Sequence, residues 1–257
     1  MNQDANAPDI LFIHGAWVGP SCWNDFAAHY AKQGLRTLAP GWPEEDRPYE
    51  SLRASPSEAL ARIGVQEIAA HYERILRAMP RQPLLIGHSF GGLIVQILLD
   101  RGLGSAGVAI HSAPPRGIFP TPQAVRSSLG PLLSWMGWRR VLTIPYDSFV
   151  HGFVHELPEP ERKRAFEEHV IPTPGRPFFQ AAFAPFIRAT QVNYRNPKRA
   201  PLLLMAGAID RTVPAALNRA NHRAYAGSGA VTEWLGRVFK LMQATRDLKR
   251  DRPVQGS

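Results

Sequence analysis

The chain alternates between short apolar runs and segments with apolar side chains at helical spacing. Apolar runs typical of buried strands occur at residues 9–13, 35–39, 83–86 and 107–110. Helical spacing occurs between these runs, at residues 22–32, 65–79 and 91–99. Residues 41–57 are rich in proline and charge and predict a surface loop. Strands that alternate with helices predict a parallel sheet with right-handed crossovers.

The alternation stops in the middle of the chain and resumes near its end. Residues 114–197 contain many prolines and aromatic side chains, with helical patches at 124–138 and 159–169. The strand–helix–strand pattern returns at residues 202–206, 214–226 and 231–234. We therefore predict an α/β fold with one discontinuous core domain. Its core would be residues 1–113 and 198–257, and residues 114–197 would form a mostly helical cap, or lid.

Size and cysteine content are consistent with one cytoplasmic domain. The 257 residues, 44% of them hydrophobic, suffice for one sizeable core. Cys22 is the single cysteine, so no intramolecular disulfide can form, which fits a reducing compartment. The polar N-terminus lacks the apolar region of a signal peptide, and no apolar run is long enough to span a membrane. We expect a cytoplasmic protein with no membrane partner.

The charge raises the question of a nucleic-acid partner. The formal net charge is +9 and the pI about 10.2. The positive side chains are scattered, and the sequence shows no helix-turn-helix or zinc-ligand spacing. They are dense in the C-terminal segment alone, at Lys240, Arg246, Lys249, Arg250 and Arg252. A solvated terminal segment explains that density, so we expect no nucleic acid.

The sequence Gly87-His88-Ser89-Phe90-Gly91 fits the pattern G-x-S-x-G. It stands between a predicted strand and a predicted helix, which is the context of a nucleophile elbow. Ser89 would be the nucleophile, and the N–H of Phe90 at the helix N-terminus would stabilise an oxyanion. The alternative is an ordinary glycine-rich turn. The strand before the motif and the helix after it favour the elbow.

Two further segments end predicted strands beside this turn. His14-Gly15-Ala16-Trp17 closes the first strand, where the N–H of Ala16 would be a second oxyanion donor and Trp17 would wall the pocket. We expect His14 to hydrogen-bond its own loop rather than to act in catalysis.

Asp210 follows the strand at 202–206 and lies where ligands bind in parallel sheets. The chain order Ser, acid, His of elbow enzymes makes it the candidate catalytic acid. Its alternative role is to cap the turn before Pro214.

These segments together resemble the α/β-hydrolase superfamily. Residues 12–17 and 21–23 are similar to the opening of its methylesterase and hydroxynitrile-lyase branch, residues 87–92 to its elbow, and residues 203–214 to its acid strand. The resemblance covers most of 9–113 and 200–236. It implies an α/β-hydrolase fold with a helical lid and acyl transfer by a serine nucleophile.

The resemblance leaves the catalytic histidine unassigned. The family carries it on the loop after the last strand, where this chain has Phe239. His222 precedes that strand in a predicted helix, so we expect it to face solvent or to cap. We expect His88 to be packed. His111, at the end of the fourth strand, is a less favoured replacement for the missing base.

Three hypotheses about function follow. The favoured one is a serine esterase or lactonase-like hydrolase acting on a small, fairly apolar ester. The second, motivated by Phe239, is a catalytically impaired or silent ligand-binding protein on the same fold. The third is a basic nucleic-acid binder, which predicts affinity that weakens steeply with salt.

No metal-ligand cluster or dinucleotide fingerprint is present, so we expect no cofactor and no metal. No oligomeric state is predicted.

Aromatic side chains of the predicted lid motivate the apolar substrate. The set comprises Trp135, Trp138, Phe149, Phe153, Phe178, Phe179, Phe183 and Phe186. The alternative, which we favour for most of them, is that they form the lid's own core.

Overall fold

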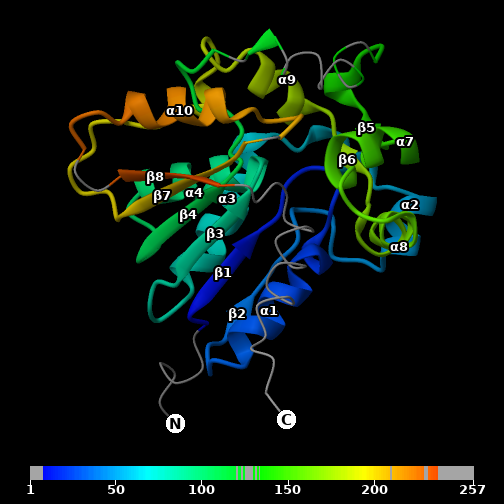
Figure 1. Cartoon of the computed structure of the whole chain (residues 1–257), viewed down its shortest axis with the longest axis horizontal. Helices are drawn as coiled ribbons and strands as arrows, with labels where there is room; N and C mark the ends of the chain where they lie inside the picture. The colour runs from blue at the N-terminus through cyan, green and yellow to red at the C-terminus, as the bar shows by residue number, and fades with distance from the viewer. Residues whose placement is uncertain are drawn as a thin grey trace.

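A parallel sheet runs through the centre of the molecule (Figure 1). The computed structural model describes residues 8–119, 121–122, 124, 130, 132, 134–208, 210–228 and 231–236. Within them the sheet has the strands β1 (Ile10–Ile13), β2 (Thr37–Leu38), β3 (Leu84–His88), β4 (Ala106–Ile110), β7 (Leu202–Gly207) and β8 (Val231–Gly236). Their order is β2-β1-β3-β4-β7-β8, and every neighbouring pair is parallel. The predicted α/β fold with a mainly parallel sheet is confirmed.

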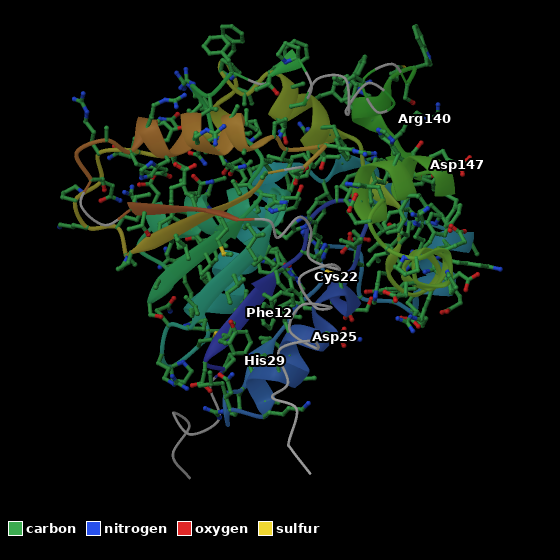
Figure 2. All side chains as sticks on the ribbon, in the orientation of Figure 1. Phe12, Cys22, Asp25, His29, Arg140 and Asp147 are labelled. Atoms are coloured by element: carbon green, nitrogen blue, oxygen red, sulfur yellow. The ribbon has the colours of Figure 1, made fainter. Side chains whose placement is uncertain are left out.

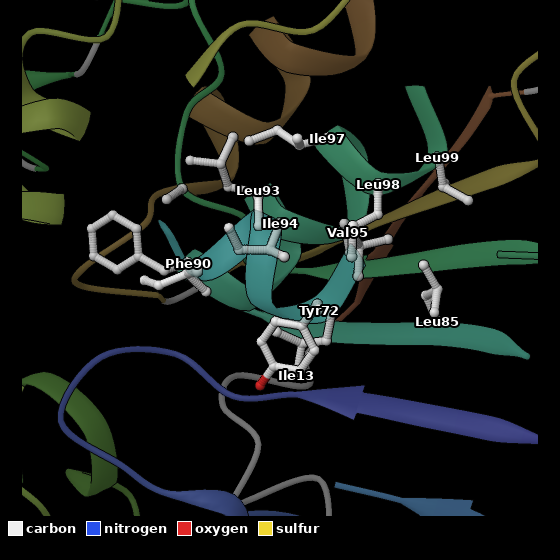
Figure 3. Packing of buried hydrophobic residues seen from close by; sticks show 14 of the residues in the cluster. Ile13, Tyr72, Leu85, Phe90, Leu93, Ile94, Val95, Ile97, Leu98 and Leu99 are labelled. Atoms are coloured by element: carbon white, nitrogen blue, oxygen red, sulfur yellow. The ribbon is translucent and has the colours of Figure 1, made fainter. Parts of the chain in front are cut away.

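Helices cover both faces of this sheet (Figure 1). The helix α1 (Asn24–Ala31) packs on one face, and α3 (Val65–Arg77) and α4 (Phe90–Asp100) pack on the other. The apolar stripe predicted at 65–79 is the buried side of α3, which ends two residues earlier than predicted. Since strand side chains alternate between faces, Leu11 and Ile13 join the core under α3 and α4, shown in Figure 3, whereas Ile10 and Phe12 join the core under α1.

A buried polar network joins α4 to the helix α10 (Ala215–Ala224) on the same face of the sheet. The amide of Gln96 donates to Ser112 Oγ at 2.7 Å and accepts from Asn221 Nδ2 at 3.1 Å and from the Tyr225 hydroxyl at 2.9 Å. Burial raises the pKa of Tyr225, so its hydroxyl remains a donor. The network fixes α10, and with it the turn that carries Asp210, relative to α4.

The predicted lid segment, 114–197, contains short helices and one small sheet. Its described elements are η4 (Gly137–Arg139), β5 (Val141–Leu142), α7 (Tyr146–Phe149), η5 (Val150–Val154), α8 (Glu159–His169), β6 (Thr173–Pro174), α9 (Arg176–Ala182) and η6 (Arg188–Thr190). The helix predicted at 159–169 is α8, whereas most of the patch at 124–138 lies outside the described residues. The antiparallel pair β5–β6 was not predicted.

The lid aromatics do not form one core of their own. Phe149 is fully buried, but in the same cluster as Phe12 and Trp23 of the core. Other members of the set are exposed instead, namely Trp135, Trp138, Phe183 and Phe186. The lid is therefore anchored through a core that it shares with the α1 face. The division into core and cap stays a prediction.

The predicted loop at 41–57 contains a helix that its composition does not indicate. The helix α2 (Tyr49–Ala54) follows Pro48 and buries Leu52. Arg53 Nε donates to the carbonyl of Val170 at 2.8 Å, so α2 is held by contact with the lid rather than by its own propensity. The 3-10 turn η2 (Pro20–Trp23) precedes α1, and the 3-10 turn η3 (Glu58–Arg62) precedes α3. None of the described helices is long and apolar enough to cross a membrane.

Candidate active site

Ser89 occupies a sharp turn between β3 and α4. The strand ends at His88 and the helix begins at Phe90, so a single residue connects them. Ser89 has φ 56° and ψ −118°, a conformation that residues with a side chain rarely adopt. Its N–H donates to the carbonyl of Ile110 at 2.9 Å, and its carbonyl accepts from the N–H of Ala113 at 3.0 Å. The turn is therefore held by the segment that follows β4.

Glycines allow the strands and the helix to approach at this turn. A Cβ on Gly91 would lie 2.7 Å from the carbonyl oxygen of His14 and closer still to that of Ile13. A Cβ on Gly87 would collide with Gly91 O and lie 2.8 Å from Gly92 N. Both glycines of the motif are thus required by backbone contacts.

The loop after β1 lies directly beside the elbow. A Cβ on Gly15 would meet Ser89 Cβ at 2.8 Å, which shows how closely the two segments pass. Ala16, Trp17, Ser89 and Phe90 all line one cavity of about 1040 Å³. Four of the predicted site residues are therefore brought together at one cavity.

His14 is engaged within this loop. Its Nδ1 lies 2.9 Å from the carbonyl oxygen of Gly15, as predicted for a loop-ordering role. Its Nε2 lies 3.1 Å from Glu45 Oε2, and its ring stacks on Trp42 with centroids 5.0 Å apart. Glu45 also accepts from the N–H of Trp42 at 2.9 Å. No sequence pattern indicates this buried glutamate, because it lies in a segment whose composition is that of a surface loop.

Asp210 fulfils the capping role that the sequence analysis left open. Its Oδ1 accepts from Thr212 N at 2.7 Å, Thr212 Oγ1 at 2.9 Å and Val213 N at 2.8 Å, which orders the turn before α10. Its Oδ2 lies 2.5 Å from Nδ1 of His111. Both side chains are almost fully buried, with 2% of His111 and 1% of Asp210 exposed.

His111, a less favoured candidate for the missing base on the sequence alone, lies beside Asp210. The residue directly after β4 has φ 47°, and its N–H donates to the carbonyl of Met205 in β7 at 2.8 Å. The ring of His88 lies near it, with centroids 5.9 Å apart. The available signal was the strand order, because a histidine ending the strand between those of Ser89 and Asp210 must lie near both.

The remaining sequence candidates lie elsewhere. His222 is on α10, with its side chain 36% exposed and Nδ1 3.5 Å from Glu233 Oε2, in keeping with the predicted solvent-facing role. Phe239 lies outside the described residues. Among the described side chains, no three of His, Cys, Asp or Glu are grouped so as to hold a metal ion.

The cavity combines an apolar wall with a few polar groups. Trp17 and Phe90 both pack against Phe178, at centroid distances of 5.0 and 5.3 Å. Polar lining residues other than Ser89 include Arg140 and Asp147, which lie on the lid side of the molecule (Figure 2). Arg211 and His151 line it as well, with Arg211 Nη1 3.4 Å from His151 Nδ1.

Comparison with known sequences assigns the chain to a family. Residues 10–237 match the Alpha/beta hydrolase family, and the chain belongs to it. The predicted superfamily is thus confirmed, and the family supports a hydrolase as the class of protein. No curated protein is similar to the chain in sequence at a significant level.

Solved structures share the fold across almost their whole length. Polyneuridine aldehyde esterase has 12% identity and a TM-score of 0.65, covering 95% of this chain and 96% of its own. A methylesterase from Arabidopsis has 14% identity and a TM-score of 0.63, with coverage of 94% and 97%. A pyrethroid hydrolase from Sphingobium faniae has 18% identity and a TM-score of 0.62, with coverage of 97% and 99%. At these identities the similarity concerns the fold.

Proposed function

We propose that this protein is a serine hydrolase that cleaves a small, largely apolar ester, with Ser89 as the nucleophile. The observation that carries the proposal is the position of Ser89. It has the strained backbone of an elbow, it is half-buried, and it faces a cavity that Ala16 and Phe90 also line. Strain of this kind persists where tertiary contacts impose it, and it is concentrated at functional sites.

The elbow provides for the charge that ester cleavage develops. Phe90 is the first residue of α4, so its N–H has no carbonyl partner within the helix and points out of the helix N-terminus. Ala16 lines the same cavity, and its backbone N–H would be the second donor. Attack of Ser89 Oγ on the ester carbonyl would place the oxyanion between these donors. A single such donor contributes about 10²–10³ to turnover in well-studied enzymes.

The cavity supports the choice of substrate. About 1040 Å³ is at the upper end of the range of small-molecule sites, so an acyl group and an alcohol group both fit. Most lining side chains are apolar, and the aromatic ones include Trp17, Phe90, Phe153 and Phe178. Burial of apolar groups of the ester against them would supply most of the binding free energy.

A silent binding protein on the same fold is the second candidate. The observation in its favour is Phe239, at the position where the resemblance to the family leads us to expect the catalytic histidine. Without a base, the oxyanion donors and the cavity would still bind an ester. They would leave no more than roughly 10³–10⁴ of rate enhancement over water.

Covalent labelling distinguishes the two candidates. A fluorophosphonate probe should label the wild-type chain on Ser89, located by peptide mass spectrometry, and Ser89→Ala should abolish the label. Ser148→Ala is the matched control, because Ser148 also lines the cavity but lies on the lid helix α7, and it should keep the label. Hydrolysis of a short p-nitrophenyl ester should follow the same pattern. A wild-type chain that is neither labelled nor active would favour the silent binding protein.

A further inference from the structure

We propose that His111 is the general base that activates Ser89, so that the histidine of this site comes from the end of β4 rather than from the loop after β8. The inference rests on the proposed serine hydrolase function. It names the residue that the family pattern leaves unassigned in this chain.

The first argument is the contact between His111 and Asp210. Nδ1 of His111 lies 2.5 Å from Oδ2 of Asp210, and because a carboxylate can only accept, Nδ1 would carry the proton between them when the ring is neutral. The ring is then held in the tautomer whose Nε2 is unprotonated. Nε2 would then be the nitrogen that accepts a proton. A buried carboxylate that fixes the tautomer and leaves the far nitrogen as acceptor is the arrangement that catalytic bases use.

The second argument is the rigidity of the carboxylate. Oδ1 of Asp210 is held by three donors from Thr212 and Val213. The remaining oxygen, Oδ2, therefore has a fixed direction, and it is the oxygen that meets His111. An orienting acid needs one such fixed oxygen, and in this structure it is already directed at an imidazole.

The third argument is the position of His111 relative to Ser89. The last register pair between β3 and β4 is His88 with Ile110, so Ser89 and His111 are the next residues along both strands. Neighbouring strands lie about 4.8 Å apart. The backbone of Ser89 is hydrogen-bonded to Ile110 on one side of His111 and to Ala113 on the other. His111 is thus in the segment that encloses the nucleophile.

The fourth argument is backbone strain at His111 itself. Its φ of 47° is in the left-handed region, which is unfavourable for a residue with a Cβ. Ser89, directly across the strands, is strained as well. The left-handed backbone at His111 ends the strand alternation of β4 directly after Ile110.

Three other histidines that the sequence or the cavity brings into question are less suitable. His14 is committed to Glu45 and Gly15, and His222 to Glu233 on the outer side of α10. His151 lines the cavity, but the group nearest its Nδ1 is the cation of Arg211 rather than a carboxylate. The ring that the structure places against Asp210 is that of His111.

The proposed step balances in protons and electrons. His111 Nε2 takes the proton of Ser89 Oγ while Oγ bonds to the ester carbonyl carbon and its π electrons move to oxygen. Collapse of that intermediate breaks the carbon–alkoxide bond, and the imidazolium gives its proton to the leaving alcohol. Water then attacks the acyl-serine with His111 again as base, which releases the acid and restores Ser89.

The test compares Ser89→Ala, His111→Gln and the control His222→Gln with the wild-type chain in ester hydrolysis and probe labelling. In subtilisin, loss of the catalytic histidine costs about 2 × 10⁶ in turnover, so His111→Gln should lose at least ~10³-fold in kcat and His222→Gln less than ~3-fold. In His111→Ala, added imidazole should restore part of the rate.

Each outcome decides between the proposals. Activity that requires Ser89 but survives in His111→Gln would overturn the role of His111 and leave the serine hydrolase standing. A wild-type chain without labelling or turnover would overturn both. Should His111→Gln fail to fold by circular dichroism, the wild-type chain provides a second measurement by proton NMR. A low-field resonance from the His111–Asp210 hydrogen bond is expected there, and its absence would overturn the assignment.

Discussion

Replacing Gly91 by alanine tests the reasoning about the elbow. Gly91 lies in the first turn of α4, where alanine is the better helix former by about 1 kcal/mol. Propensity alone therefore predicts a more stable protein. The added Cβ, however, would lie 2.7 Å from His14 O and from Ile13 C, and nearer still to Ile13 O. These are backbone atoms of β1 and its loop, which cannot rotate away.

The magnitude follows from the balance of the two effects. Overpacking in a close-packed interior costs about 1–3 kcal/mol, and contacts with rigid backbone belong at the upper end. After the gain in propensity, we expect Gly91→Ala to lower the free energy of unfolding by about 2 kcal/mol. For a chain of this size that corresponds to roughly 4–8 °C in Tm. Activity should fall further than stability, because β1 must move away and takes Ala16 with it.

Thermal unfolding monitored by circular dichroism measures this effect. Gly152→Ala is the matched control, since its Cβ would meet only Thr212 Cγ2 at an ordinary 3.5 Å. We expect its Tm to stay within ~2 °C of wild type. A Gly91→Ala protein as stable as wild type, or an equal loss in both variants, would refute the argument that backbone contact dictates this glycine.

Three further predictions concern the rest of the fold. Gln96→Leu removes the amide to which Ser112, Asn221 and Tyr225 are hydrogen-bonded. Urea denaturation should therefore show that the free energy of unfolding falls by about 2–4 kcal/mol, and a fall of less than ~1 kcal/mol would contradict the network. Burial holds the pKa of His169 below its usual value, so the unfolded chain binds more protons and stability falls as pH drops through about 6.5. The slope of Tm between pH 7.5 and 5 should therefore flatten in His169→Gln, and equal slopes would argue against it. Burial raises the pKa of the Cys22 thiol, so a disulfide reagent should react with it at the rate of unfolding; immediate reaction in the native protein would disagree.

Hydrophobic periodicity predicted the elements that bury a single face or that are buried along their whole length. The stripe of α3 and the apolar runs of β1 and β3 could be located from the sequence, because a single face or a fully buried run leaves a clear pattern. The helix α2 could not, since one buried leucine and a hydrogen bond from Arg53 to the lid hold it in place. Contacts of that kind join residues more than a hundred positions apart.

The candidate site likewise has one part that the sequence predicts and another part that it does not. The elbow and the Ala16 loop could be predicted because short motifs encode them. The contact of His111 with Asp210 could not, because it depends on which strand lies between which others and on a left-handed backbone at one residue. Glu45, which holds His14 from a segment with the composition of a loop, is a second case.

The position of β7 inside the sheet has a consequence for how such sites evolve. The strand that leads to Asp210 has a neighbour on each side, β4 and β8, and all three run in the same direction. The imidazole of His111 contacts this aspartate from the β4 side, and a residue that follows β8 would approach it from the other side. A lineage could thus lose one histidine and recruit another from the opposite side while nucleophile and acid stayed where they were. A search that classifies a family member as inactive because one loop lacks a histidine would then misclassify active enzymes.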